Sequence, residues 1–335
     1  MNLTRRSACA LLGTGAALAL LAKPARASRF FRIATGTTVG TYFPVGRVIA
    51  SAITKPPGSR DCEDGGSCGV PGLIAVAHST QGALDNIQLV GRGMVESGFA
   101  QADQAAFAYN GAGAFLATGP LERLRAIANL YPESLHVVVR REDGIRQIAD
   151  LSGKRISIGL RESSASLRAE AILAAYGVGL DDVIREYHEP AQAAQWLRDR
   201  RIDAMVMIDG FPMPVIADLA RSREIDLLPL EGPGADALAE ANQYFKRLTI
   251  PAGTYRGIEA RSTLAVGALW LTSTKLEADL IYAITQALWR EGNRALLDGS
   301  HPMAQRIRLE TAADDLTVPL HDGARRYYRE RGLIL

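Results

Sequence analysis

RIATGTTVGTYFPVGRVIASAI, which runs from Arg32 to Ile53, contains the transition that decides the fold. The apolar run at residues 30–34 predicts a buried strand, and apolar residues at helical spacing predict a helix from Tyr42 onward. A helix N-terminus presents unpaired N–H groups and a partial positive charge, which suit a carboxylate or a phosphate. An ordinary strand-to-helix turn is the alternative. The loop before the helix combines glycines with hydroxyls: Gly36, Thr37, Thr38, Gly40 and Thr41.

A second unit of the same kind follows more than a hundred residues later. Residues 155–159 (RISIG) predict a buried strand, and a helix with a glycine after its end is predicted up to Tyr176. Ser163, Ser164 and Ser166 stand at the start of that helix. We expect the two units to face each other across a cleft and to offer their helix N-termini to one anion. A plain serine N-cap is the alternative for the second unit.

The first 27 residues have the pattern of a targeting segment. Arg5 and Arg6 precede an apolar stretch at residues 8–22, and Ala25-Arg26-Ala27 is a small-residue cleavage site. The apolar stretch is too short for a convincing membrane span. We therefore expect export to the periplasm with cleavage after Ala27, by either the general or the twin-arginine route.

The expected mature chain carries little net charge. The whole sequence has a formal charge of +2, and the targeting segment contains four basic residues and no acidic ones. A near-neutral chain gives no electrostatic reason to expect nucleic acid or an anionic membrane as a partner. Its length allows two domains.

Only two cysteines follow the targeting segment, Cys62 and Cys68 in the sequence CEDGGSC. In an oxidising compartment this pair predicts a disulfide, which would act as a local clip because it closes a short loop. Two free thiols are the alternative. No histidine or further cysteine stands close enough in sequence to indicate a metal site.

Apolar strands that alternate with helices predict an α/β fold with mostly parallel sheets. The further strands are expected at residues 73–78, 87–90, 98–100, 124–130, 135–140, 202–208 and 264–271. The further helices are expected after Asp103 and at residues 191–198, 215–221, 276–297 and 323–332.

No catalytic or cofactor motif stands out in the sequence. Residues 65–69 (GGSCG) match the G-x-S-x-G pattern of serine hydrolases, but that motif must leave a buried strand and enter a helix, and neither flanks it here. The five histidines are scattered, and His136 and His321 are expected to be structural. We expect no cofactor and no enzymatic activity.

Seven collinear motifs resemble a known family across nearly all of the expected mature chain. The chain resembles the TAXI-type solute-binding proteins, the extracytoplasmic receptors of one branch of TRAP transporters. The motifs are TGTTVGTYFPVGRVIA, GFAQADQAAFAYNG, LRAIANLYPESLHVVVR, DLSGKRISIG, IDAMVMIDGFPMPVI, IPAGTYRGIEARSTLAVGALWLTS and PLHDGARRYYRERGLI.

This resemblance implies a type II periplasmic-binding-protein fold whose two lobes close on a ligand. It implies a small organic anion or an amino acid as ligand, glutamate-like or a dicarboxylate, and an ion-gradient-driven permease as partner. Lobe 1 is expected at residues 28–130 and 275–335, and lobe 2 at residues 131–274. The chain is expected to be a monomer.

Carried onto this sequence, the resemblance also implies a set of ligand-facing residues. Where the family has a glycine-rich turn, this chain has RESSAS, so Arg161 or Arg168 is a further candidate; we favour a solvent-facing position for Arg168. The expected ligand-facing residues are Thr37, Thr38, Gly40, Tyr42, Gln101, Asp103, Tyr109, Ser163, Ser164, Ser166, Gly210, Phe211 and Pro212.

Two other functions fit the same sequence. A sensor would present its bound solute to a receptor kinase in place of a permease. An exported hydrolase would use Ser67 of the GGSCG stretch as its nucleophile.

Overall fold

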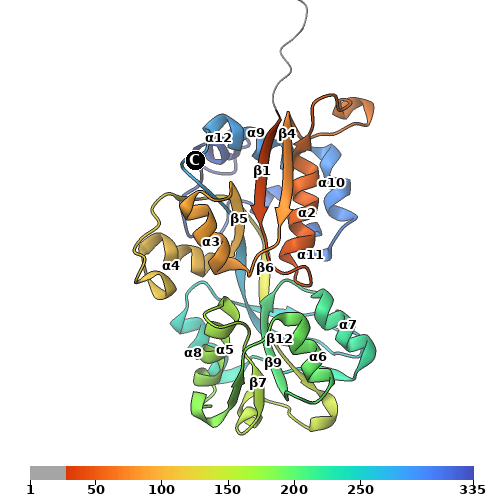
Figure 1. Cartoon of the computed structure of the whole chain (residues 1–335), viewed down its shortest axis with the longest axis vertical. Coiled ribbons are helices and arrows are strands. Elements are labelled where there is room, and N and C mark those ends of the chain that lie inside the picture. The colour runs from red at the N-terminus through yellow and green to blue at the C-terminus, as the bar shows by residue number, and fades with distance from the viewer. Residues whose placement is uncertain (1–27) are drawn as a thin grey trace, which may run out of the picture.

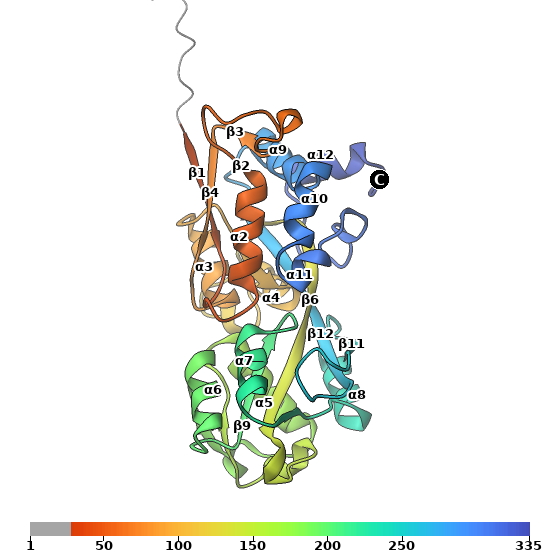
Figure 2. The same cartoon turned by 90° about the vertical axis from the view of Figure 1, so that its right-hand side faces the viewer.

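The computed structural model describes residues 28–335, so the expected targeting segment at residues 1–27 lies outside the described residues. Figure 1 shows two lobes stacked along the long axis of the molecule, and Figure 2 shows the same division from the side. One twelve-stranded sheet continues from one lobe into the other. Within residues 28–335, no helix has the length and apolar character needed to cross a membrane.

The N-terminal part of the chain and the C-terminal helices build lobe 1, the upper lobe of Figure 1. The strand of residues 29–34 pairs in parallel with the strands of residues 73–78 and 97–101, which confirms the expected alternation of strands and helices. Its strands are β1 (Arg29–Ala34), β2 (Thr54–Lys55), β3 (Val70–Pro71), β4 (Leu73–His78) and β5 (Ser97–Gln101). Its helices are α2 (Tyr42–Ile53), α3 (Ala83–Arg92), α4 (Ala102–Asn110), α9 (Ala278–Leu288), α10 (Glu291–Asp298), α11 (Pro302–Gln305) and α12 (Asp322–Glu330).

The middle of the chain builds lobe 2, the lower lobe of Figure 1. The second predicted strand–loop–helix unit is confirmed here as β7 followed by α5. The strands of lobe 2 are β7 (Arg155–Ser157), β8 (Ile184–Glu186), β9 (Ala204–Asp209), β10 (Ile225–Leu227) and β11 (Lys246–Ile250). Its helices are α5 (Ser164–Ala175), α6 (Pro190–Arg198), α7 (Pro214–Ser222) and α8 (Gly232–Ala241).

Two long antiparallel strands, β6 (Leu124–Arg140) and β12 (Arg261–Ser273), belong to both lobes. In lobe 1, β12 pairs with β5, and in lobe 2, β6 pairs with β9. The sheet order is β3-β2-β4-β1-β5-β12-β6-β9-β7-β8, with β10 on β6 and β11 on β12. Because the shared strands are antiparallel to their neighbours, the sheet is mixed and not mostly parallel. The two-lobed α/β architecture is as expected.

The strands expected at residues 124–130 and 135–140 form one continuous strand, because β12 pairs across the interruption. Gly267 lies opposite Pro132, and the register of the two strands shifts shortly after this pair, between Ala268 and Leu269. Tyr131 pairs with Ala268, and the pairing of β12 with β5 in lobe 1 begins at the same residue.

Two further elements differ from the expectation. Residues 87–90 belong to α3, where Ala83, Ile87 and Val90 are buried at helical spacing. The helix expected at residues 276–297 is divided into α9 and α10. Near the division, the Asn293 amide donates hydrogen bonds to Ala287 O (2.7 Å) and Ala52 O (2.8 Å) and so satisfies a carbonyl at the end of α9.

The predicted disulfide between Cys62 and Cys68 is confirmed, with the two Cα atoms 4.6 Å apart. It lies against α10, where a side chain at Gly292 would come within 2.7 Å of Cys68 Sγ. The Arg290 guanidinium donates a hydrogen bond of 3.0 Å to Cys68 O. The clip therefore attaches an exposed loop to the C-terminal helices of lobe 1.

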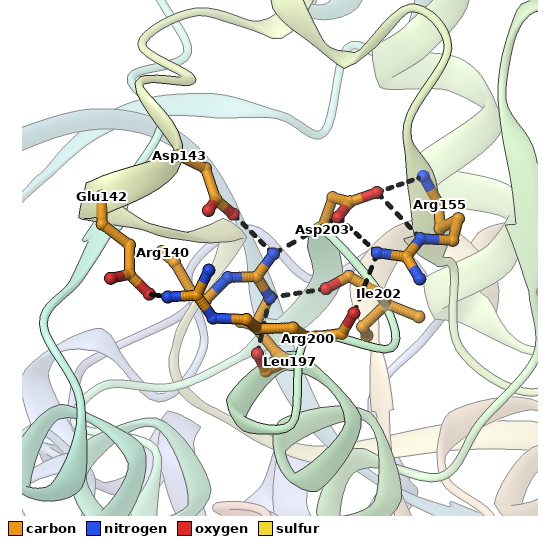
Figure 3. Close-up of polar contacts among 8 residues, drawn as sticks. All are labelled: Arg140, Glu142, Asp143, Arg155, Leu197, Arg200, Ile202 and Asp203. Atoms are coloured by element: carbon orange, nitrogen blue, oxygen red, sulfur yellow. Dashed lines mark hydrogen bonds and ion pairs between the residues drawn. The ribbon is translucent and has the colours of Figure 1, made fainter.

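A polar network closes the end of lobe 2 farthest from lobe 1 (Figure 3). The buried Arg140 guanidinium donates hydrogen bonds of 2.6 Å to Leu197 O and to Ile202 O. Its remaining contacts are ion pairs with Asp143 (2.5 Å) and Asp203 (3.3 Å). Asp203 also accepts hydrogen bonds from Arg155, so one carboxylate joins β6, β7 and β9.

Candidate functional site

A cavity of about 350 Å³ lies between the two lobes. The N-termini of α2 and α3 reach it from lobe 1, and those of α5 and α6 reach it from lobe 2. Four helix N-termini concentrate N–H groups and partial positive charge on one space, which favours an anionic group there. The polar lining residues are Thr37, Gln81, Asp85, Gln88, Gln101, Glu133, Ser157, Arg161, Glu162, Ser163, Ser164, His188 and Asp209, together with Tyr42.

The loop before α2 contributes Thr37, Gly40 and Tyr42 to the cavity. Thr38 is exposed and is not among the lining residues. Gly40 is required by its surroundings, because a Cβ there would lie 2.8 Å from Asp209 Oδ2. This close approach lets the lobe-2 carboxylate reach the backbone of lobe 1.

The serine loop before α5 contributes Ser163 and Ser164. Ser163 Oγ accepts a hydrogen bond of 3.2 Å from the Ser166 N–H, so the serine N-cap considered as the alternative is also present. The Ser166 hydroxyl donates to Ser163 O and does not line the cavity. The Ser164 hydroxyl instead crosses to lobe 1 and donates a hydrogen bond of 3.0 Å to Gln101 Oε1.

Glu133 on β6 is a buried acid that the sequence analysis did not select. Its Oε2 accepts a 2.5 Å hydrogen bond from Gln101 Nε2, while its Oε1 has no partner among the described residues. Burial, and secondarily the charge of Asp209, raises the pKa of Glu133 well above its ordinary range. Burial and the Glu133 charge likewise raise the pKa of the Tyr42 hydroxyl.

Asp209, at the end of β9, is the second buried acid that was not among the expected ligand-facing residues. Its Oδ2 accepts a 2.8 Å hydrogen bond from the Thr41 N–H at the start of α2, and its Oδ1 accepts one of 2.8 Å from the Gly210 N–H. Burial raises the pKa of Asp209 to about 6, and the two backbone donors partly offset that rise. Glu133 lies within YPES and Asp209 within VMID, and an acidic residue within an apolar run is the sequence signal that could have identified both acids.

Acidic groups outnumber basic ones around the cavity. Glu133 and Asp209 are joined there by Asp85 and Glu162, while Arg161 is the basic residue on the lining apart from His188. The Arg161 guanidinium lies 3.9 Å from the centre of the Tyr187 ring. The cavity therefore combines helix N-termini with two buried carboxyl groups.

Six of the expected ligand-facing residues line this cavity, and the structure brings them together from both lobes: Thr37, Gly40, Tyr42, Gln101, Ser163 and Ser164. Seven lie elsewhere: Thr38, Asp103, Tyr109, Ser166, Gly210, Phe211 and Pro212. Phe211 and Pro212 border a different hollow, of about 920 Å³, where Arg306 lies 5.0 Å from the Phe211 ring centre.

Arg168 was expected to face solvent, and that expectation is wrong. Its side chain is buried against lobe 1 and forms an ion pair with Asp103. The helix position alone gave no sign of this, because the partner carboxylate comes from α4 in the other lobe. Among residues 28–335, no cluster of three or more side chains has the makeup of a metal site.

Comparison with known protein families identifies the family of this chain. It belongs to the NMT1-like family, whose family model matches residues 33–332. Among solved structures, it is similar to the alkanesulfonate-binding protein SsuA from Xanthomonas axonopodis pv. citri bound to MOPS, with 19% identity over 85% of this chain and 83% of that one and a TM-score of 0.46. It is also similar to the periplasmic aliphatic sulphonate binding protein SsuA from Escherichia coli, with 16% identity over 91% and 84% of the two chains and a TM-score of 0.46.

Proposed function

We propose that this chain is an extracytoplasmic receptor that binds one small solute between its lobes and delivers it to a membrane permease. The observation that carries the proposal is the cavity of about 350 Å³, to which both lobes contribute helix N-termini and polar side chains. A ligand that contacts both lobes stabilises the closed arrangement through those differential contacts, without any chemical step.

The charges of the cavity favour an amino acid over a dicarboxylate. A carboxylate fits the helix N-termini, where Thr37 and Ser163 supply hydroxyls. An ammonium group fits the acidic part of the cavity, because Glu133 and Asp209 are buried acids. Glu133 Oε1 has no hydrogen-bond partner among residues 28–335. A dicarboxylate that lacks an ammonium group would bring no cation to these acids, with Arg161 as the basic side chain to offset the added charge.

The partner is proposed from the seven motifs that resemble TAXI-type receptors, and it is an ion-gradient-driven TRAP permease. The periplasmic location follows from the pattern of residues 1–27. Uptake of labelled ligand by vesicles that contain the permease, dependent on added receptor, supports this partner. Ligand-dependent stimulation of a receptor kinase, without such uptake, would instead favour the sensor.

Calorimetry with matched ligands and variants tests the proposed site. L-Glutamate is compared with 2-oxoglutarate, which lacks the ammonium group, and with the other amino acids. Losing a hydrogen bond to a charged group costs about 1.5–3 kcal/mol, so we expect Thr37→Ala and Ser163→Ala to weaken binding roughly tenfold or more. Thr38→Ala is the matched control, because Thr38 is exposed beside the cavity. Equal affinities in all three variants would contradict the site.

A further inference from the structure

Asp103 is a fully buried carboxylate that the cavity does not use. It lies in the first turn of α4 in lobe 1, and it is absent from the cavity lining. Its Oδ1 accepts a 2.8 Å hydrogen bond from the Gln104 N–H in its own helix. The other oxygen is turned toward lobe 2, so this residue connects the two lobes.

Both donors to Asp103 Oδ2 come from lobe 2. The Arg168 guanidinium on α5 forms an ion pair with it, and Asn242 Nδ2, directly after α8, donates a 2.8 Å hydrogen bond. Figure 1 shows α4 at the lower left of lobe 1, on the same side of the molecule as α5 and α8 of lobe 2. Arg168 also lies over the Phe245 ring, with its guanidinium carbon 5.1 Å from the ring centre.

Burial sets this ion pair apart from the other ion pair that joins the lobes among residues 28–335. The side chains of Asp103 and Arg168 are 0% and 7% exposed. The pair of Lys246 on β11 with Asp315 also joins lobe 2 to lobe 1, but its side chains are 63% and 53% exposed. Exposed pairs contribute little, whereas removing one partner of a buried pair leaves an unpaired charge away from water, which is strongly unfavourable.

We propose that Asp103, Arg168 and Asn242 form a clasp that holds the two lobes together on the α4 side of the cleft. The clasp positions the lobes and does not touch the ligand, so it sets the balance between open and closed molecules independently of solute chemistry. This inference adds to the proposed receptor function and rests on it for its biological role. It also gives the DQAAF segment around Asp103 a structural role in place of ligand contact.

The charges of the clasp determine how variants behave. In Arg168→Gln, the Asp103 carboxylate loses its cation while the lobes are closed, and opening relieves this by exposing the carboxylate to water. In the double variant Asp103→Asn/Arg168→Gln, neither charge remains, so the closed arrangement is restored in part. Such a non-additive result is the signature of a direct pair.

Distances between spin labels on the two lobes test the clasp in protein that has been denatured and refolded to remove any retained solute. The full chain carries Cys9→Ser and labelled cysteines at the exposed positions Leu116 in lobe 1 and Ile184 in lobe 2. We expect one short distance in the parent protein, a second and longer population in Arg168→Gln, and a shift back toward the parent in the double variant. Asp315→Asn is the matched control and should leave the distances unchanged.

An unchanged distance distribution in folded Arg168→Gln would overturn the clasp. If that variant does not fold, Asn242→Ser removes the 2.8 Å hydrogen bond to Asp103 and keeps a hydroxyl that can accept from the Tyr244 N–H in place of Asn242 Oδ1, and the same distances decide. An equal shift in Asp315→Asn would also contradict the proposal, because it would make burial irrelevant. Since no solute is added, the clasp can fail while ligand binding is found, and the receptor function can fail while the clasp is found.

Discussion

Asp209→Asn should remove part of the pH dependence of stability, with a sign and size that follow from the site. The pKa of this buried carboxyl is raised from its ordinary value of 3.8 to about 6, so the folded protein binds a proton here more readily than the unfolded chain. Stability therefore falls as the pH rises between these two values. At about 1.4 kcal/mol per pKa unit, the full effect is about 3 kcal/mol.

Part of this effect, rather less than half, is accessible in one comparison close to neutral pH. Lowering the pH from about 7 to about 5 recovers about 1 kcal/mol of it, because the folded carboxyl takes up its proton in that range. For a protein of this size that corresponds to a rise in Tm of about 2–4 °C. The neutral amide of Asp209→Asn has no such titration, and it retains an oxygen that can accept from the Thr41 N–H.

The assay is thermal denaturation of both proteins at the two pH values, followed by circular dichroism. The difference between the parent and the variant isolates the Asp209 contribution from groups that titrate in both. Loss of the Asp209 charge also lowers the pKa of Glu133, because Asp209 is one cause of its elevation, and this change acts in the same direction. Identical pH dependence in the two proteins would refute the reasoning.

Three further predictions concern lobe stability and the disulfide. Burial alone would raise the pKa of Asp203, but the hydrogen bonds that it accepts from Arg155 hold this pKa below its ordinary value. The ionised Asp203 therefore stabilises the fold above the ordinary pKa, and this stabilisation is lost as the pH falls through the pKa of the folded protein. Asp203→Asn should destabilise lobe 2 by about 2 kcal/mol in urea denaturation at neutral pH, because the buried Arg140 loses one of its two ion-pair partners and retains Asp143. No loss of stability would count against the network in Figure 3. Glu142→Gln, in the same view, breaks an exposed pair with Arg200 and should change stability by less than about 0.5 kcal/mol, so a loss as large as that of Asp203→Asn would show that burial does not decide the effect. Free-thiol titration of the unreduced, denatured chain should find no reactive thiol at Cys62 or Cys68, and the Cys62→Ser/Cys68→Ser variant should retain ligand binding; a free thiol at either residue would contradict the disulfide.

Local patterns predicted much of the secondary structure because they reflect local physics. The strand–loop–helix units around Thr37 and Ser163 combine a buried apolar run with a helix cap, and both features are encoded within a few residues. The strand predicted at residues 87–90 was wrong, because a short apolar run does not distinguish a strand from one face of a helix.

Contacts between distant segments determined what the sequence did not reveal. The continuity of β6 depends on β12, which pairs with it more than a hundred residues later in the chain. Arg168 is buried only because Asp103 of the other lobe meets it. Six of the expected ligand-facing residues line the cavity, while Glu133 and Asp209 were missed because the apolar periodicity that defines a strand gives no weight to an isolated buried acid.

Native mass spectrometry of the exported protein, purified without refolding, tests the central claim most directly. The account predicts one small molecule per chain, released on denaturation, with the mass of a compound that carries both an amino and a carboxyl group. Protein carrying Thr37→Ala should lose that molecule under the same conditions, whereas Thr38→Ala should retain it. A chain that carries no small molecule, and that takes up none after incubation with the amino acids or dicarboxylates, would contradict the receptor function.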